Sequence, residues 1–188
     1  MEVQHLNVKF FVANPEAVKL EDFLTIFNGW IQKRATDDLL VDVADYRHVH
    51  AGPGIVLIGH EANYGMDNTG NRLGLLYNRK APLNGNPQDR LARVVRTALL
   101  ACQRLEKENK LKFNGQEAQV LINDRLLAPN TAETFSALEP ELKALFDKLY
   151  GGAKYTLERD PEPRERFTVN VKAEGSFNIE GLLKNLGK

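Results

Sequence analysis

The sequence predicts an α+β fold, with a mainly antiparallel sheet of about six or seven strands covered by about three main helices. Three observations lead to this prediction. Short apolar alternations recur along the chain, which is typical of half-buried strands. Longer segments carry apolar residues three or four positions apart, which is typical of amphipathic helices. Several connections are short and rich in Gly, Pro, Asn and Asp, and such turns join antiparallel neighbours.

The composition is that of a soluble globular protein, and we expect one domain over residues 1–188. Hydrophobic residues make up 43% and charged residues 27%, so disorder is not expected. Lys and Arg number 25, as do Asp and Glu, and this balance argues against a nucleic-acid partner. We expect neither a signal peptide nor a membrane segment, because no apolar run approaches the ~20 residues of a membrane helix.

The single cysteine, Cys102, limits the chemistry of the chain. No intrachain disulfide and no Cys-x-x-Cys metal site can form, which fits a reducing, cytoplasmic location. Cys102 lies on the apolar stripe of a predicted helix, so we interpret it as a core residue rather than a nucleophile.

The chain opens with a strand and a helix. Residues 5–12 alternate apolar and polar side chains, which predicts a strand that Asn14 and Pro15 end. Residues 20–34 place Phe, Leu, Ile and Trp side chains at helical spacing. The first helix is therefore expected to bury a broad aromatic face.

Residues 39–80 are expected to form an antiparallel meander of three strands. The strands are predicted over residues 39–50, 55–64 and 72–79. Gly52, Pro53 and Gly54 favour a tight turn between the first two, and residues 66–71 form the second turn.

A long helix follows. Asn86 is a suitable N-cap, Pro87 suits the first helical position and Asp89 lies in the first turn. The apolar stripe predicts that this helix runs to about Glu108 or Asn109. Its basic residues form a line, which we interpret as a solvated face rather than an anion site: Arg90, Arg93, Arg96, Arg104 and Lys107.

The rest of the chain continues the alternation of strands and helices. We expect a short strand at residues 119–122, a capped turn at Asn130 to Glu133, and a helix that restarts near Leu138 because Pro140 disfavours a helix interior. A hairpin over residues 154–158 and 167–172 and a last helix over residues 177–186 complete the prediction.

The order of these elements raises an internal duplication as a hypothesis. The predicted order β-α-β-β-β-α over residues 1–110 is followed by β-α-β-β-α over residues 116–188, and the segments 20–24 and 138–142 resemble each other. A true duplication predicts two half-sheets about a pseudo-twofold axis. The alternative is that α+β proteins produce such strings by chance.

The polar centre of the 39–80 segment is the main candidate site, since it holds three of the four histidines. With Gly52 and Pro53 at the hairpin tip, Asp45 is expected opposite His60, with Arg47 on the same apolar face. His48 and His50 then lie with Tyr46 on the other face. Because strand parity separates His60 from the other two histidines, we expect no metal site.

Two interpretations of the Asp45–Arg47–His60 group remain open. It forms a buried polar network that fixes the strand register, which we favour, or it is catalytic, with His60 as general base oriented by Asp45 and Arg47 holding an anion. The candidate ligand-binding residues are Tyr46, Arg47, His48, His50, Glu61 and Tyr64.

Known catalytic and phosphate-binding motifs are missing from the sequence. We therefore predict a non-catalytic binding or assembly domain for a partner protein or a small ligand, without a cofactor and with homodimerisation as one form of assembly. An enzyme that uses His60 is the alternative.

Overall fold

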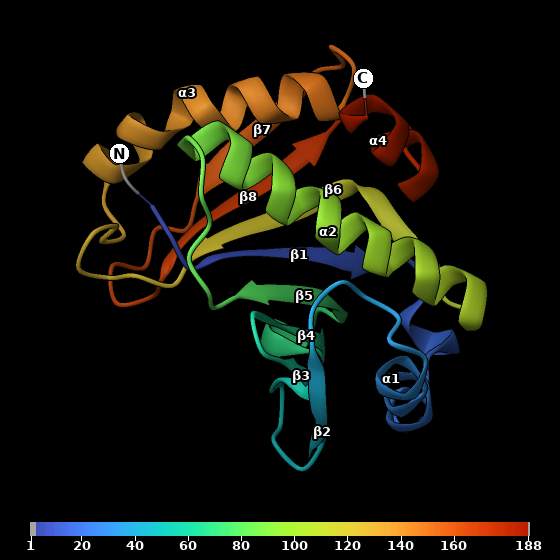
Figure 1. The fold of residues 1–188 in the computed structure, drawn as a ribbon. Helices are drawn as coiled ribbons and strands as arrows, with labels where there is room; N and C mark the ends of the chain where they lie inside the picture. The colour runs from blue at the N-terminus through green and yellow to red at the C-terminus, as the bar shows by residue number, and fades with distance from the viewer. Residues whose placement is uncertain (1–2, 188) are drawn as a thin grey trace.

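The computed structural model describes residues 3–187 and confirms the α+β class (Figure 1). Within this range it has one antiparallel sheet of eight strands, in the order β2-β3-β4-β5-β1-β6-β8-β7, and four α-helices. The number of strands and of helices is thus slightly larger than predicted. No helix among these residues has the length and apolar character needed to cross a membrane.

The elements have the following bounds. The strands are β1 (Leu6–Val12), β2 (Leu40–Tyr46), β3 (Gly54–Gly59), β4 (Ala62–Asp67), β5 (Gly74–Arg79), β6 (Phe113–Ile122), β7 (Tyr155–Arg159) and β8 (Phe167–Ala173). The helices are α1 (Asp22–Lys33), α2 (Pro87–Glu108), α3 (Ala132–Leu149) and α4 (Ile179–Leu186).

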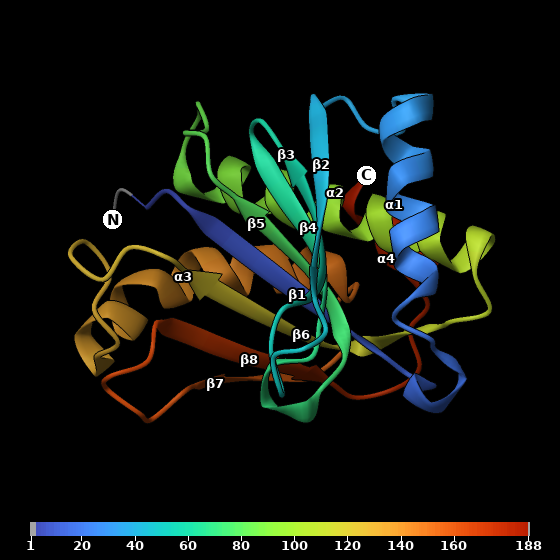
Figure 2. The same ribbon diagram turned by 90° about the horizontal axis from the view of Figure 1, so that it is seen from below.

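The sheet is strongly twisted, and α2, α3 and α4 lie over one of its faces (Figure 1). Seen from below, β2, β3 and β4 run at a steep angle to β6 and β8, and α1 lies beside β2 (Figure 2). Leu6, Val8 and Phe10 of β1 belong to the hydrophobic core, and their alternation in the sequence predicted the strand. The residues between them are buried as well, so both faces of β1 are covered.

Each predicted half of the chain forms one side of this sheet. β1 pairs with β5, the last strand of the first half, and β6 pairs with β8, the last strand of the second. β1 and β6 are antiparallel neighbours at the centre. The duplication itself stays a prediction.

The 39–80 segment forms four strands rather than the predicted three. The apolar stretch 55–64 is divided at His60 and Glu61 into β3 and β4. The Asp38 carboxylate closes this turn by accepting hydrogen bonds from Glu61 N (3.0 Å) and Ala62 N (2.9 Å). Gly59 permits the approach, because a Cβ there would meet an Asp38 oxygen at 2.3 Å. No local pattern signals this long-range contact.

The predicted register of the first hairpin is wrong. Asp45 lies opposite Ile55, not opposite His60. The strand ends early because the Asp45 carboxylate accepts a hydrogen bond from Arg47 N (3.0 Å), an arrangement typical of turns. Residues 47–53 therefore form a loop, and His60 N donates to Leu39 O (2.8 Å) at the far end of β2.

α3 also differs from the prediction, since it is continuous and contains Pro140. Pro140 and Ser136 are both exposed, so the carbonyl that loses its helical donor faces water. β6 is longer than predicted, and the N-cap of α3 is Thr131 rather than Asn130.

Other predictions are confirmed. The Asn86 side chain caps α2, accepting from Asp89 N at 2.9 Å. The hairpin of β7 and β8 and the helix α4 form where the apolar patterns placed them. Cys102 is buried in the core, and burial raises the pKa of its thiol well above the ordinary range.

Candidate functional site

The candidate site is a cleft of about 680 Å³ on the helix-covered side of the sheet. One wall is α2, the other comprises residues 35–38 after α1 together with Glu61 and Arg79, and the floor includes residues of β4 and β5. We call it the α2 cleft.

Three aromatic side chains form the floor of the α2 cleft. Trp30 and Tyr64 meet edge to face with ring centroids 6.2 Å apart, and Tyr64 and Tyr77 do the same at 5.1 Å. All three are at most 3% exposed. Burial raises the pKa of both phenols above the ordinary value, which is itself far above neutral pH, so both hydroxyl groups are protonated.

The wall opposite α2 is fixed by hydrogen bonds. Arg79 donates to the Glu61 carboxylate (2.7 Å) and to Ala81 O (2.9 Å). Lys80 Nζ donates to Gly59 O (2.6 Å), and Asp38 holds the same turn from the other side. The end of β5 and the β3–β4 turn are therefore tied together.

The α2 wall carries one helix face of mixed character: Arg93, Thr97, Leu100, Arg104 and Lys107. Leu100 is 47% exposed, which is high for leucine. The Arg104 guanidinium lies 5.7 Å from the centre of a Trp30 ring and 3.7 Å from Glu108. Trp30 Nε1 donates to Glu108 Oε2 (2.6 Å), which links the floor to this wall.

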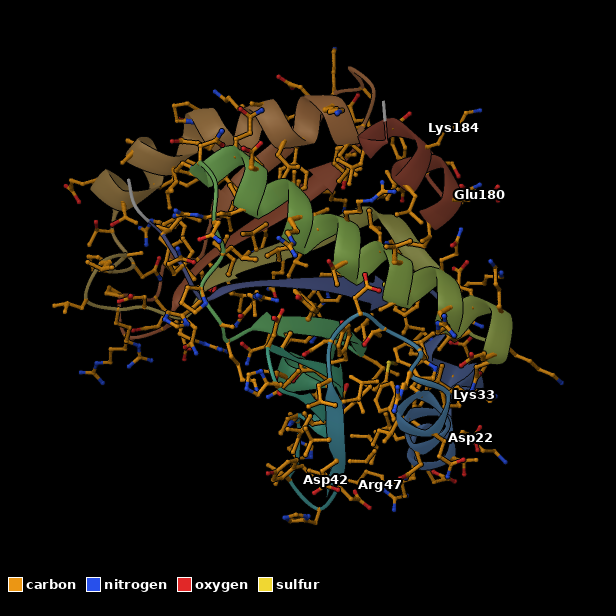
Figure 3. The ribbon with its side chains drawn as sticks, in the orientation of Figure 1. Asp22, Lys33, Asp42, Arg47, Glu180 and Lys184 are labelled. Carbon is orange, nitrogen blue, oxygen red and sulfur yellow. The ribbon has the colours of Figure 1, made fainter. Side chains whose placement is uncertain are left out.

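The cleft contains two of the residues predicted from sequence, Glu61 and Tyr64. The other six do not line it: Asp45, Tyr46, Arg47, His48, His50 and His60. His48 and His50 are exposed in the 47–53 loop, so they do not share a strand face with Tyr46. Arg47 lies at the lower end of the molecule, away from α2 (Figure 3).

Asp45 and Arg47 do form a pair, but an exposed one. Arg47 donates to Asp45 Oδ2 at 2.7 Å, and their side chains are 38% and 37% exposed. The hydrogen bonds from Arg47 lower the pKa of the Asp45 carboxyl to about 2. The predicted buried network is therefore wrong, and His60, which is exposed at the other end of the hairpin, is not part of the pair.

The sequence did contain signals for residues that were missed. Three members of the basic line on the second helix, Arg93, Arg104 and Lys107, line the cleft. Trp30, Tyr77 and Arg79 were interpreted only as parts of a helix and a strand. Their meeting depends on the tertiary packing of α1, α2 and β5.

Comparison of the chain with protein-family models, with curated proteins and with solved structures finds no match. Among residues 3–187, no three His, Cys, Asp or Glu side chains gather in a way that would hold a metal ion. The chemistry of the α2 cleft is therefore argued from its own residues.

Proposed function

We propose that the protein is a non-catalytic binding domain that holds a small ligand in the α2 cleft. The observation that carries this proposal is the cleft itself, about 680 Å³, with a buried aromatic floor and walls made mostly of polar and charged side chains. Ligand pockets are typically ~300 to 1,000 Å³, and polar groups on their walls fix the orientation of the ligand. The hydrogen-bonded wall reduces the conformational freedom that is lost on binding.

The state of the polar groups favours binding over proton transfer. Tyr64 and Tyr77 are neutral at pH 7, as an ordinary phenol is, and burial raises their pKa values further. Glu61 is paired with Arg79, and Asp38 accepts hydrogen bonds from the backbone. These groups offer fixed donors and charges, which orient a ligand.

Trp30 provides a built-in test, because it is the only tryptophan and it lines the cleft. Its indole N–H gives a single side-chain cross-peak in a nitrogen-15 spectrum. We expect members of a fragment library to shift this cross-peak. Thr97→Phe places a large side chain in the cleft from the α2 wall. The affinity of each such fragment should fall about tenfold or more, because a methyl-sized clash already costs about 1 kcal/mol or more.

Ser136→Phe is the matched control, because Ser136 is exposed on α3 outside the cleft. It should leave the fragment affinities unchanged. A library that leaves the Trp30 cross-peak in place, or binders that tolerate Thr97→Phe, would contradict ligand binding in the α2 cleft.

A second candidate function, assembly of two copies of the chain, is favoured by one observation at the edge of the sheet. β2 is an edge strand, and among residues 3–187 four of the seven exposed large hydrophobic side chains lie in it or in the segments beside it: Leu39, Val41, Tyr46 and Val49. An exposed apolar edge is a template for pairing with an identical strand. We propose that two copies associate along β2 about a twofold axis.

Molar mass measured by light scattering over a range of concentrations tests this assembly. Val41→Lys should shift the mass toward the monomer, because Val41 is 60% exposed on the edge. Leu126→Lys is the control, because Leu126 is exposed in a loop away from β2, and this variant should not change the molar mass. A monomer at every concentration would refute assembly and leave the cleft proposal standing.

A further inference from the structure

We infer that the ligand of the α2 cleft carries an acidic group, which Arg104 and Lys107 bind beside Trp30. This inference rests on the proposed function. Arg104 and Lys107 both line the cleft and are three residues apart, so they share one face of α2. An anion between them would meet two cations and the edge of the aromatic floor.

The balance of charges at this end of the cleft favours an anion. Among residues 3–187, Lys107 forms no ion pair. Arg104 faces Trp30 and is 3.7 Å from Glu108, too far for a strong hydrogen bond. Glu108 itself accepts the Trp30 N–H at 2.6 Å, so its charge is partly satisfied by that donor.

The other charged residues of the cleft are arranged differently. At about 1.5 Å per residue, Arg93 lies about 21 Å from Lys107 along α2, so a small ligand does not reach both. Arg79 is neutralised by Glu61, and the Asp38 carboxylate lies against the same turn. Asp37 lies on the wall opposite α2, in the segment after α1. The end with Arg104 and Lys107 is therefore the better anion site.

The exposed Leu100 side chain suggests the rest of the ligand. It lies one turn before Arg104 on the same wall, above a floor that contains Trp30 and Tyr64. Covering it with an apolar group would remove apolar surface from water. The ligand class is thus a small molecule with an apolar part that covers Leu100 and with one acidic group.

Three probes share one aromatic ring system and differ in the charge of the group attached to it: naphthalene-2-carboxylate, 2-naphthylmethanol and 2-naphthylmethylammonium. Dissociation constants are measured by calorimetry, with the Trp30 cross-peak reporting the place of binding. We expect the carboxylate to bind about tenfold more tightly than the alcohol, and the ammonium most weakly. Added salt should lower the affinity of the protein for the carboxylate probe, and not its affinity for the other two probes.

Variants locate the acidic group. Arg104→Gln combined with Lys107→Gln should remove the preference for the carboxylate and leave the affinity for the alcohol within about twofold. Arg96→Gln, on the same helix but outside the cleft lining, should keep the preference. Arg93→Gln should keep it as well.

The outcomes distinguish this inference from the proposed function. Equal binding of carboxylate and alcohol in the cleft, or a preference lost only in Arg93→Gln, overturns the acidic-group assignment and leaves ligand binding intact. No shift of the Trp30 cross-peak with any probe contradicts both. A preference that survives in the double variant also overturns the assignment.

Discussion

The α2 cleft and the β2–β3 hairpin each contain an arginine–carboxylate pair at 2.7 Å, but in different surroundings. The Arg79 side chain is 9% exposed and also donates to Ala81 O, while the side chain of its partner Glu61 is 46% exposed. The Arg47 and Asp45 side chains are both more than a third exposed, at the end of a strand. Equal contact distances therefore do not imply equal roles, since exposed pairs are screened and add little to stability.

The strongest expected contrast between the two regions concerns their aromatic residues. Trp30→Ala removes a side chain that is 2% exposed and packs on Phe27 and Tyr64, so we expect a loss of about 3–5 kcal/mol in the free energy of unfolding. Tyr46→Ala in the hairpin removes a side chain that is 41% exposed and should cost about 0.5 kcal/mol or less. Urea denaturation followed by circular dichroism measures both free energies of unfolding. Similar losses in Trp30→Ala and Tyr46→Ala would contradict the expected difference between the cleft and the hairpin.

The next contrast compares two aspartates that accept backbone hydrogen bonds. Asp38 holds Glu61 N and Ala62 N across the chain, whereas Asp42 accepts only from the adjacent Val43 N at 2.8 Å. Asp38→Ala should cost about 1–3 kcal/mol, because it leaves two backbone donors without their partner. Asp42→Ala should change the free energy of unfolding by about 0.5 kcal/mol or less.

Hydrogen exchange locates the effect of Asp38→Ala. The amides of the β3–β4 turn should exchange faster, and those of β8 should keep their protection. If Asp38→Ala proved as mild as Asp42→Ala, the cleft wall would not depend on this carboxylate.

Local patterns predicted the elements well, and failed where distant residues decide the structure. The Asn86 cap and the alternation of β1 and β8 are readable because both signals lie within a few neighbouring residues. The β3–β4 turn was missed because the group that closes it, Asp38, precedes it by more than twenty residues. The hairpin register failed because a turn centred on Gly52 and Pro53 was assumed, whereas Asp45 ends the strand earlier.

The candidate site was only partly predictable for the same reason. Glu61 and Tyr64 were named because they lie near the histidines, and three residues of the α2 wall were noted as a basic line. Periodicity shows that a helix has a basic face, but not what that face meets. The packing of α1 and α2 over β4 and β5 converts it into the wall of a cleft.

The smallest expected effect concerns the titration of Asp45. The hydrogen bonds from Arg47 lower the pKa of the Asp45 carboxyl to about 2, below the ordinary value for aspartate, so the pair stabilises the fold above that ordinary value and loses its contribution as the pH falls toward 2. A carbon-13 titration of the carboxyl group should give a pKa below the ordinary value for aspartate, and Arg47→Gln should raise the pKa toward that value. Because the pair is exposed and water screens it, the midpoint of urea denaturation at pH 7 should fall only slightly in Arg47→Gln. A clear loss of stability in this variant would mean that the exposed hairpin pair contributes substantially to the fold, and the contrast between the two regions would fail.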